Sequence, residues 1–256
     1  HGVITKPSTM HIAYTHSPGR MWWEPETYFA GSFRFPQFLT KLSAFPAAVL
    51  SPFLSWLRQW DYVAAQRVDY FISNSSEVKR RIKKFYGRES TVIYPFVNLE
   101  RFRQPVYEDS QAGNGFFLIV SRLARWKRLD LAIKACNKLK QPLVIIGEGS
   151  DRKRLENMAG PTIKILGRLS DQDVVNYLKL ARALIFPQKE DFGITPLEAM
   201  AAGKPVIAYK AGGALETILP DETGEFFYPQ SVRSLADAIS RFDERRFRSD
   251  VCREQA

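Results

Sequence analysis

Short apolar runs alternate regularly with helical segments in the second half of the sequence, and this alternation restricts the fold more than any other feature. Each run is nearly continuous in apolar residues, and segments with helical periodicity separate neighbouring runs. Strands that are apolar on both faces are typical of a parallel sheet covered by helices on both sides. The second half is therefore predicted to be a doubly wound α/β domain, with strands at FFLIV (116–120), LVIIG (143–147), IKIL (163–166), ALIF (183–186) and PVIA (205–208).

The first half is predicted to carry a shorter version of the same pattern. A basic helical segment, SSEVKRRIKKFY (75–86), lies between two short strands in a β-α-β rhythm. A polar, turn-rich stretch at 103–115 then interrupts the periodicity. We therefore divide the chain into two domains, 1–107 and 108–256. The strands expected in the first are 11–15, 68–72 and 91–94.

Net charge and cysteine content indicate which partners the chain binds and in which compartment it occurs. The net charge of +10 indicates an anionic partner, which is nucleic acid, an acidic membrane surface or a phosphate-bearing ligand. Cys136 and Cys252 have no paired spacing, so neither a disulfide framework nor a zinc site is predicted, and a reducing compartment is favoured. His1 begins no signal-peptide pattern, and we expect a fragment of a longer cytoplasmic protein.

The loops that follow the predicted strands are the expected ligand sites, because open parallel sheets bind ligands outside the carboxyl ends of their strands. Arg122 and Lys127 are placed to converge on one polyanion, although a solvated surface pair is an equal alternative. Gly147 and Gly149 lack the third glycine of a dinucleotide-binding turn, and Lys204 is followed by proline rather than Ser or Thr. Neither a dehydrogenase nor a nucleoside triphosphatase is predicted.

The sequence GITP predicts the start of a helix. Gly193 lets the backbone approach a ligand closely, Thr195 is the expected N-cap, and Pro196 suits the first helical position. The free N–H groups of such a helix start favour an anion. Glu198 is expected to complete a capping box with Thr195, whereas Glu190 precedes the helix and has no such local structural role.

Two further loops show related patterns. The Gly-Gly turn at 212–213 precedes another short helix. In GRLSDQD, Ser170 and Asp173 are expected to form a capping box. That assignment leaves Gly167 and the backbone of Arg168 as candidates to contact a nucleobase.

These motifs occur in the order found in one enzyme family. The segments VSRLARWKRLDLAIKACNKL (120–139) and LVIIGEGSDRKRLE (143–156), the E-x7-E pair and the Gly-Gly turn resemble the donor-binding domain of family 4 retaining glycosyltransferases. The first half resembles the acceptor-side domain of bacterial mannosyltransferases of the O-antigen and polysaccharide type. The implied architecture is the GT-B fold, with two Rossmann-like doubly wound parallel-sheet domains, the N-terminal one incomplete in this chain.

The resemblance also implies a role for each matching residue. Arg122 and Lys127 would hold the donor diphosphate and stabilise it as the leaving group. Glu190 would contact the hydroxyls of the transferred sugar, Glu198 the donor ribose, and His16 would lie near the reacting sugar on the acceptor side. The backbone would contact sugar and phosphate oxygens at Phe192, Gly193, Ile194 and Thr195, and the base would be lined by Gly167, Arg168 and Leu169.

The reaction implied is transfer of a hexose, with retention at the anomeric carbon, from a nucleoside diphosphate sugar to a hydroxyl of a glycan or lipid-linked glycan. GDP-mannose is the first choice of donor and a UDP-hexose the second. The family needs no catalytic metal or cofactor, and the sequence lacks a D-x-D pair. Hydrolysis by paired carboxylates is not expected, because the adjacent Glu190 and Asp191 project differently. Departures from the family pattern at Gly19, Met21 and YPFVN (94–98) leave the acceptor open.

An aromatic stretch at 20–60 bears on partners and location. Pro46 and Pro52 are expected to interrupt any straight membrane-spanning helix there. Its aromatics and cations, with the basic helix at 75–86, fit either an anionic membrane surface, on the inner face of the cytoplasmic membrane, or core and acceptor-cleft lining. Two rival functions are an inactive donor-binding subunit and a basic nucleic-acid-binding protein, although no nucleic-acid-binding module is recognisable.

Overall fold

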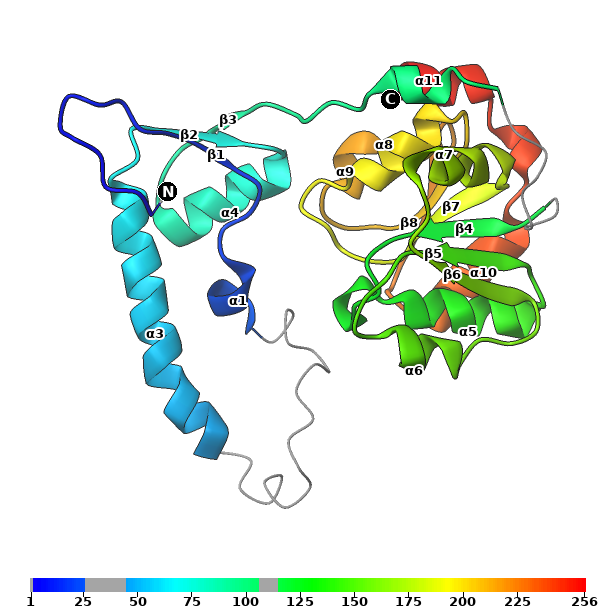
Figure 1. Cartoon of the computed structure of the whole chain (residues 1–256), viewed down its shortest axis with the longest axis horizontal. Coiled ribbons are helices and arrows are strands. Elements are labelled where there is room, and N and C mark those ends of the chain that lie inside the picture. The colour runs from blue at the N-terminus through cyan, green and yellow to red at the C-terminus, as the bar shows by residue number, and fades with distance from the viewer. Residues whose placement is uncertain (1, 26–44, 106–114) are drawn as a thin grey trace. The chain divides into compact units, whose positions relative to one another are not determined.

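The structure of the chain, a computed structural model, describes residues 2–25, 45–105 and 115–256 (Figure 1). It divides into two compact units, His1–Tyr94 and Pro95–Ala256. The sequence placed the division at 107, after the 3-10 helix η2 (Leu99–Phe102). The difference has a packing reason, because Phe102 is buried in the core of the second unit.

The first unit holds a small parallel sheet in the order β1-β2-β3. Its strands match the expected positions, although the third is short: β1 (Ile12–Thr15), β2 (Tyr70–Ser73) and β3 (Thr91–Val92). Helices α1 (Arg20–Trp23), α3 (Phe45–Gln66) and α4 (Ser76–Tyr86) accompany it. The helix α4 begins where the Ser75 hydroxyl accepts a bond from the Val78 N–H and ends at Gly87 in the left-handed conformation.

One buried carboxylate joins the helices α1, α3 and α4 of the first unit. Asp61 on α3 is 1 % exposed and accepts hydrogen bonds from the Trp23 indole at 2.7 Å and the Tyr86 hydroxyl at 2.8 Å. Burial, together with the Asp61 charge, raises the pKa of Tyr86 well above its usual range. The tyrosine therefore stays protonated and remains a donor to Asp61.

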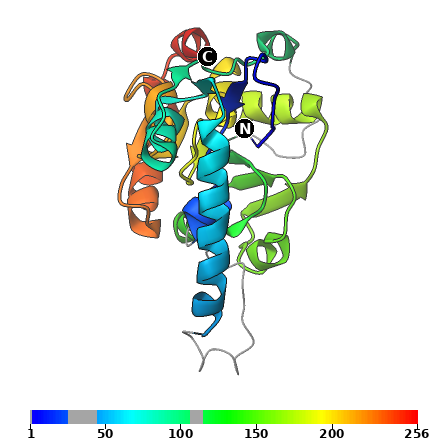
Figure 2. The ribbon, with the colours of Figure 1, turned by 90° about the vertical axis from the view of Figure 1, so that its left-hand side faces the viewer.

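The helix α3 corrects one expectation from the sequence. It runs without interruption through Pro52, which was expected to break it (Figure 1, Figure 2). Pro46 lies in the first turn, where backbone N–H groups have no partner inside the helix, and Pro52 removes a single hydrogen bond from a long helix. Within the part of the chain that the structure describes, no helix combines the length and apolarity needed to cross a membrane.

The second unit holds a parallel sheet in the order β6-β5-β4-β7-β8-β9. Five strands lie where apolar runs predicted them. The sixth, β9, was missed because Gly224 and Glu225 interrupt its apolar pattern, yet it pairs along its length with β8. The strands are β4 (Phe117–Val120), β5 (Leu143–Ile146), β6 (Ile163–Gly167), β7 (Ala183–Phe186), β8 (Val206–Tyr209) and β9 (Gly224–Phe227).

Helices cover both faces of this sheet, as the doubly wound prediction requires. Two separate apolar cores form, one on each face. The first lies against α5 (Leu129–Leu139), α6 (Arg152–Glu156) and α10 (Val232–Arg241). The second lies against α7 (Asp171–Leu180), α8 (Ile194–Ala201), α9 (Ala214–Thr217) and α11 (Ser249–Gln255). Two further 3-10 helices are η3 (Arg125–Lys127) and η4 (Glu244–Arg246).

Candidate functional site

The strand order of the second unit defines one switch point. The chain leaves β4, adds β5 and β6 on one side, and then returns to place β7 on the other side of β4. Helices that leave adjacent strands in opposite directions open a crevice beyond the carboxyl ends of those strands. The loops after β4 and β7 therefore form the expected ligand crevice, and they carry Arg122, Lys127 and Glu190.

An ion pair joins the two loops across this switch point. The Lys127 ammonium, at the end of η3, bonds to the Glu190 carboxylate in the loop after β7. Both side chains are largely enclosed, at 14 % and 19 % exposure. The ammonium also lies 4.2 Å from the centroid of the Trp126 ring. A cation and a carboxylate are thus held side by side where a ligand of an open sheet binds.

The Gly-Gly turn after β8 fixes the backbone of the Glu190 loop. Gly213 donates its N–H to the Glu190 carbonyl at 3.0 Å, and Gly212 forms an isolated bridge with Glu190. A Cβ on Gly213 would lie 2.3 Å from the Phe192 carbonyl oxygen, closer than any real contact. The turn needs glycine because two backbones pass without room for a side chain.

Gly213→Ala is expected to destabilise the second unit by about 1–3 kcal/mol, the usual cost of overpacking. Its backbone, at φ −63° and ψ −20°, accepts alanine, so the cost is the collision with the 190–192 backbone alone. Urea unfolding measures the effect. The matched control is Leu215→Ala, which changes an exposed side chain in the same helix. Equal stability of the two variants would contradict the close approach.

The helix start at GITP differs from the expected capping box. The helix α8 has Gly193 as its N-cap, at φ +88°, and no side chain caps it. Thr195 lies within the first turn, and Glu198 is the fifth helical residue, two positions beyond the third residue that a capping box uses. The N-cap is Gly193 rather than Thr195 because glycine adopts this left-handed backbone conformation at little cost. Phe192, just before the cap, is buried, whereas Ile194 is 45 % exposed.

Glu198 instead contacts a residue that the sequence did not single out. Arg101, on η2, lies 3.9 Å from the Glu198 carboxylate and 3.3 Å from that of Asp171. Burial raises the pKa of Glu198, Arg101 opposes this shift, and Asp171 adds to it. No local pattern predicts the contact, because Arg101 precedes the first strand of the sheet.

The raised pKa of Glu198 predicts a pH dependence of stability. The folded state holds this proton more tightly than the unfolded chain does, so the free energy of unfolding falls as pH rises from the ordinary glutamate pKa to the raised value. Glu198→Gln should flatten that fall and be relatively more stable at neutral pH. Thermal melts from pH 4 to 8 measure it, with the exposed Glu222→Gln as the control. Parallel curves for Glu198→Gln and wild type would contradict the burial argument.

The remaining donor-side residues lie on the same edge of the sheet. Gly167 ends β6 at φ +74° and accepts a hydrogen bond from the Gly147 N–H at 2.7 Å. Arg168 is exposed and Leu169 is half-buried. The Ser170 hydroxyl caps α7, as predicted, and also contacts the Asp173 carboxylate. Arg122 is exposed, and its side chain makes no ion pair among the described residues.

His16 belongs to the first unit. It follows β1, is exposed, and its ring lies edge-on to that of Tyr14 with centroids 5.2 Å apart. Of the site residues predicted from the sequence, all except His16 therefore lie in the second unit. Across residues 2–25, 45–105 and 115–256, no group of three or more His, Cys, Asp or Glu is arranged to hold a metal ion.

Comparison with known proteins decides the family. The model of the family described as glycosyl transferases group 1 matches residues 100–256, more than half of the chain. The chain belongs to this family. Solved structures confirm the GT-B architecture expected from the sequence. A sucrose-phosphate synthase from Thermosynechococcus elongatus superposes with a TM-score of 0.76 at 23 % identity, covering 95 % of this chain and 62 % of that one.

The chain is similar to several curated mannosyltransferases. The human alpha-1,3/1,6-mannosyltransferase ALG2 is 28 % identical over 80 % of this chain and 56 % of its own length. O-antigen chain mannosyltransferase C of Escherichia coli is 27 % identical over 72 % and 52 %. A GDP-mannose-dependent phosphatidylinositol monomannoside mannosyltransferase of Corynebacterium glutamicum is 33 % identical over 67 % and 52 %. The chain spans about half the length of these relatives.

Proposed function

We propose that this chain is part of a retaining glycosyltransferase that moves a hexose from a nucleoside diphosphate sugar to a hydroxyl of a glycan or lipid-linked glycan in cell-surface polysaccharide synthesis. The observation that carries the proposal is the Lys127–Glu190 pair at the β4/β7 switch point. It offers a cation for phosphate beside a carboxylate for sugar hydroxyls, which are the two recognition tasks of a sugar nucleotide.

The donor diphosphate would lie between Arg122 and Lys127. A lysine ammonium has three donors, so Lys127 can keep Glu190 while it binds a phosphate oxygen. Arg122 is exposed at the same loop and can supply a second charge. Both cations stabilise the negative charge that develops on the departing nucleoside diphosphate. Glu190, held by the Gly-Gly turn, accepts hydrogen bonds from hydroxyls of the transferred sugar.

The rest of the donor lies along the same edge. Glu198 accepts from the ribose, and His16 serves the acceptor side in the first unit. The base lies against Gly167, Arg168 and Leu169, and the backbone that receives sugar and phosphate oxygens belongs to Phe192, Gly193, Ile194 and Thr195.

Mannose is the favoured sugar and GDP the favoured nucleotide. Support comes from the mannosyltransferases among the relatives, one of which is named as GDP-mannose-dependent. A UDP-hexose is the second choice, since a structural neighbour from Anabaena, HepE, is described in complex with UDP and glucose. That neighbour has a TM-score of 0.67 at 22 % identity over 77 % of this chain and 60 % of its own.

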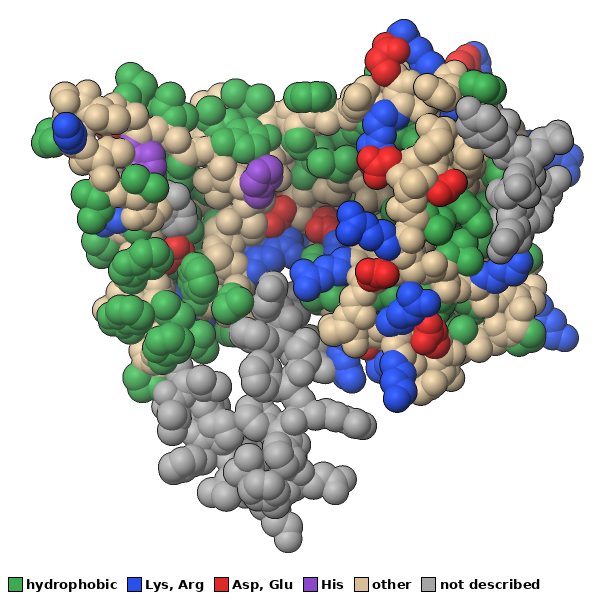
Figure 3. All heavy atoms as spheres, viewed as in Figure 1, with side chains coloured by type: hydrophobic (Ala, Val, Ile, Leu, Met, Phe, Trp, Pro, Cys, Tyr) green, Lys and Arg blue, Asp and Glu red, His purple; other side chains and the backbone are tan. Residues whose placement is uncertain are grey.

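The first unit supports peripheral contact with an anionic membrane on the cytoplasmic side, where a lipid-linked acceptor would be available. Hydrophobic side chains gather on the face of α3 seen in Figure 3, and Phe53, Trp56 and Trp60 are each about half exposed. The helix α4 adds cations at Lys79, Arg80, Lys83 and Lys84. Aromatics at the interface and cations at the headgroups are the usual combination of such surfaces.

The test is a transfer assay on the protein that carries this chain. Labelled GDP-mannose and UDP-hexoses are offered with lipid-linked glycans, and the anomeric configuration of the product is read by NMR. Retained α-linked product supports the proposal. Donor binding without transfer would indicate an inactive subunit instead, and salt-dependent binding to duplex DNA without nucleotide binding would indicate the nucleic-acid-binding alternative.

A further inference from the structure

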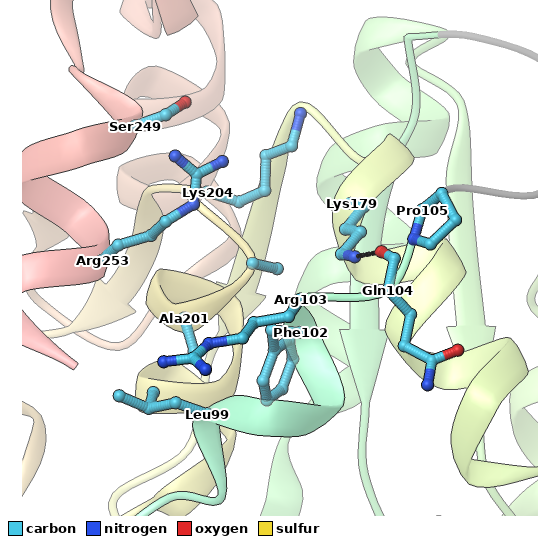
Figure 4. Close-up of a pocket in the computed structure, with 11 residues that line it drawn as sticks. Leu99, Phe102, Arg103, Gln104, Pro105, Lys179, Ala201, Lys204, Ser249 and Arg253 are labelled. Atoms are coloured by element: carbon cyan, nitrogen blue, oxygen red, sulfur yellow. Dashed lines mark hydrogen bonds between the residues drawn. The ribbon is translucent and has the colours of Figure 1, made fainter.

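A second cavity of the second unit lies at the edge of the sheet opposite the candidate donor site. It has a volume of about 620 Å³. Lys179, near the end of α7, leads into β7, and Lys204 leads into β8, so the cavity lies where parallel strands begin rather than where they end. Figure 4 shows Lys204 and Arg253 on one side and Lys179 with Gln104 on the other, with Arg103 between them.

Among the residues that the structure describes, four cations and no carboxylate line this cavity: Arg103, Lys179, Lys204 and Arg253. Arg103 pairs with Glu100 at 2.8 Å, and Lys179 donates to the Gln104 carbonyl. Among the described residues, Lys204 and Arg253 make no ion pair.

Nearby groups of opposite sign do not balance these charges. The C-terminal ends of α7 and α8 point here, but each supplies only about half a negative charge. Glu244 acts on Lys204 from a distance, yet its carboxylate is bonded to Arg182 at 3.2 Å. The described lining of the cavity therefore carries a net positive charge.

The cations also repel one another in a partly enclosed space. Burial lowers the pKa of Lys204 and of Lys179, and Arg253 lowers both further. The guanidinium of Arg253 lies against Gly203, where a Cβ would be only 2.8 Å from its Nη2. An anion between these groups would remove the repulsion, and it would not compete with a built-in carboxylate.

The rest of the lining is mostly apolar, with two uncharged polar residues, Gln104 and Ser249. The apolar residues are Leu99, Phe102, Pro105, Ala201 and Ala202. The volume falls within the range of small-molecule sites, which combine an apolar wall with a few converging polar groups. A ligand that carries both phosphate and a nonpolar portion would satisfy both parts of the lining.

We propose that this cavity is a second anion site, separate from the donor loops, that binds a phosphate monoester or diphosphate with an apolar substituent. Such a phosphate can come from a soluble metabolite or from a lipid headgroup. The site shares no residue with the donor crevice, so this proposal does not depend on whether the chain transfers a sugar.

The test measures pyrophosphate binding by calorimetry to the full chain, with GDP present at saturation to occupy the donor loops. Lys204→Gln and Arg253→Ala should each weaken binding at least tenfold, the scale of a lost charge-assisted hydrogen bond. Lys138→Ala, an exposed lysine on α5 at the other face of the sheet, is the matched control and should bind as wild type does. GDP affinity should be unchanged in Lys204→Gln, and its melting temperature should not fall, because the substitution removes one of the mutually repelling cations.

Two probes separate the sources of the phosphate. If pyrophosphate and octyl phosphate bind but vesicles of phosphatidylglycerol in phosphatidylcholine do not, the ligand is soluble. If the vesicles also bind, and Lys204→Gln weakens vesicle binding as much as it weakens pyrophosphate binding, the ligand is a lipid headgroup. Pyrophosphate binding that is absent, or equal in wild type, Lys204→Gln, Arg253→Ala and Lys138→Ala, overturns the proposal.

Discussion

Lys127→Met is expected to weaken the binding of GDP and UDP by about 1.5–3 kcal/mol, which is on the order of ten- to a hundredfold in Kd. Methionine keeps an aliphatic stem beside Trp126 and removes only the charge. The loss is expected because Lys127 is the enclosed cation at the switch point, and its bond to a phosphate is made in a partly desolvated site. Calorimetric titration of each nucleotide measures the effect.

Removing Lys127 also leaves Glu190 without this partner, so a control must separate the two effects. The double variant Lys127→Met with Glu190→Gln restores a neutral pair. If the phosphate contact is direct, the double variant binds nucleotide as weakly as Lys127→Met. If binding returns to the wild-type level, Lys127 acts only by neutralising Glu190 and the diphosphate role is wrong. Lys134→Ala, on the exposed side of α5, checks for a nonspecific charge effect.

Glu190→Gln is expected to reduce sugar transfer by about a hundredfold or more while the protein stays folded. Glutamine removes the charge and one of the two acceptor oxygens, a loss on the order of 3 kcal/mol if sugar hydroxyls bond to both oxygens, and about 1.4 kcal/mol is tenfold in rate. GDP binding should not weaken, because the change releases Lys127 from its carboxylate partner. The assay is steady-state transfer, with GDP affinity and a thermal melt measured on the same sample.

The combination of results distinguishes a role in the reaction from a role in folding. Lost transfer with intact GDP binding and an unchanged melt supports contact with the transferred sugar. A lower melting temperature with weaker GDP binding would show that Glu190 mainly holds the two loops together. Glu148→Gln is the matched control, because it replaces an exposed carboxylate in the loop after β5 by a carboxamide. It should leave transfer unchanged.

Much of the fold follows from the sequence because buried parallel strands leave a clear local signal. The segments around β5 and β7 are apolar at every position and were placed to within a residue. The strand β9 left no such signal, since Glu225 is buried against Arg246, whose guanidinium lies 3.0 Å away, and burial of a carboxylate depends on a partner far along the chain. The same applies to η2, whose place in the second unit depends on where Phe102 packs.

The sequence indicates candidate residues for the site but not how they are arranged. Lys127 and Glu190 each follow a strand, which the sequence shows, but they are 63 residues apart and only the β4-β7 adjacency brings them together. The start of α8 was misplaced because threonine and proline are strong local signals, whereas the actual N-cap, Gly193, is favoured by a positive φ and by a close approach to Phe186, 2.9 Å from where a Cβ would lie. The contact of Arg101 with Glu198 is likewise a product of tertiary packing.

The central claim is that a sugar nucleotide binds at the carboxyl ends of β4 and β7 in the second unit. Hydrogen exchange of the chain with and without GDP-mannose tests it most directly, with UDP-glucose as the second donor. Bound donor is expected to slow exchange in the loops at 121–128, 167–169, 187–195 and 209–213 and to leave exchange in α5 and α10 unchanged. Protection that is absent with both donors, or that falls outside these loops, would contradict it.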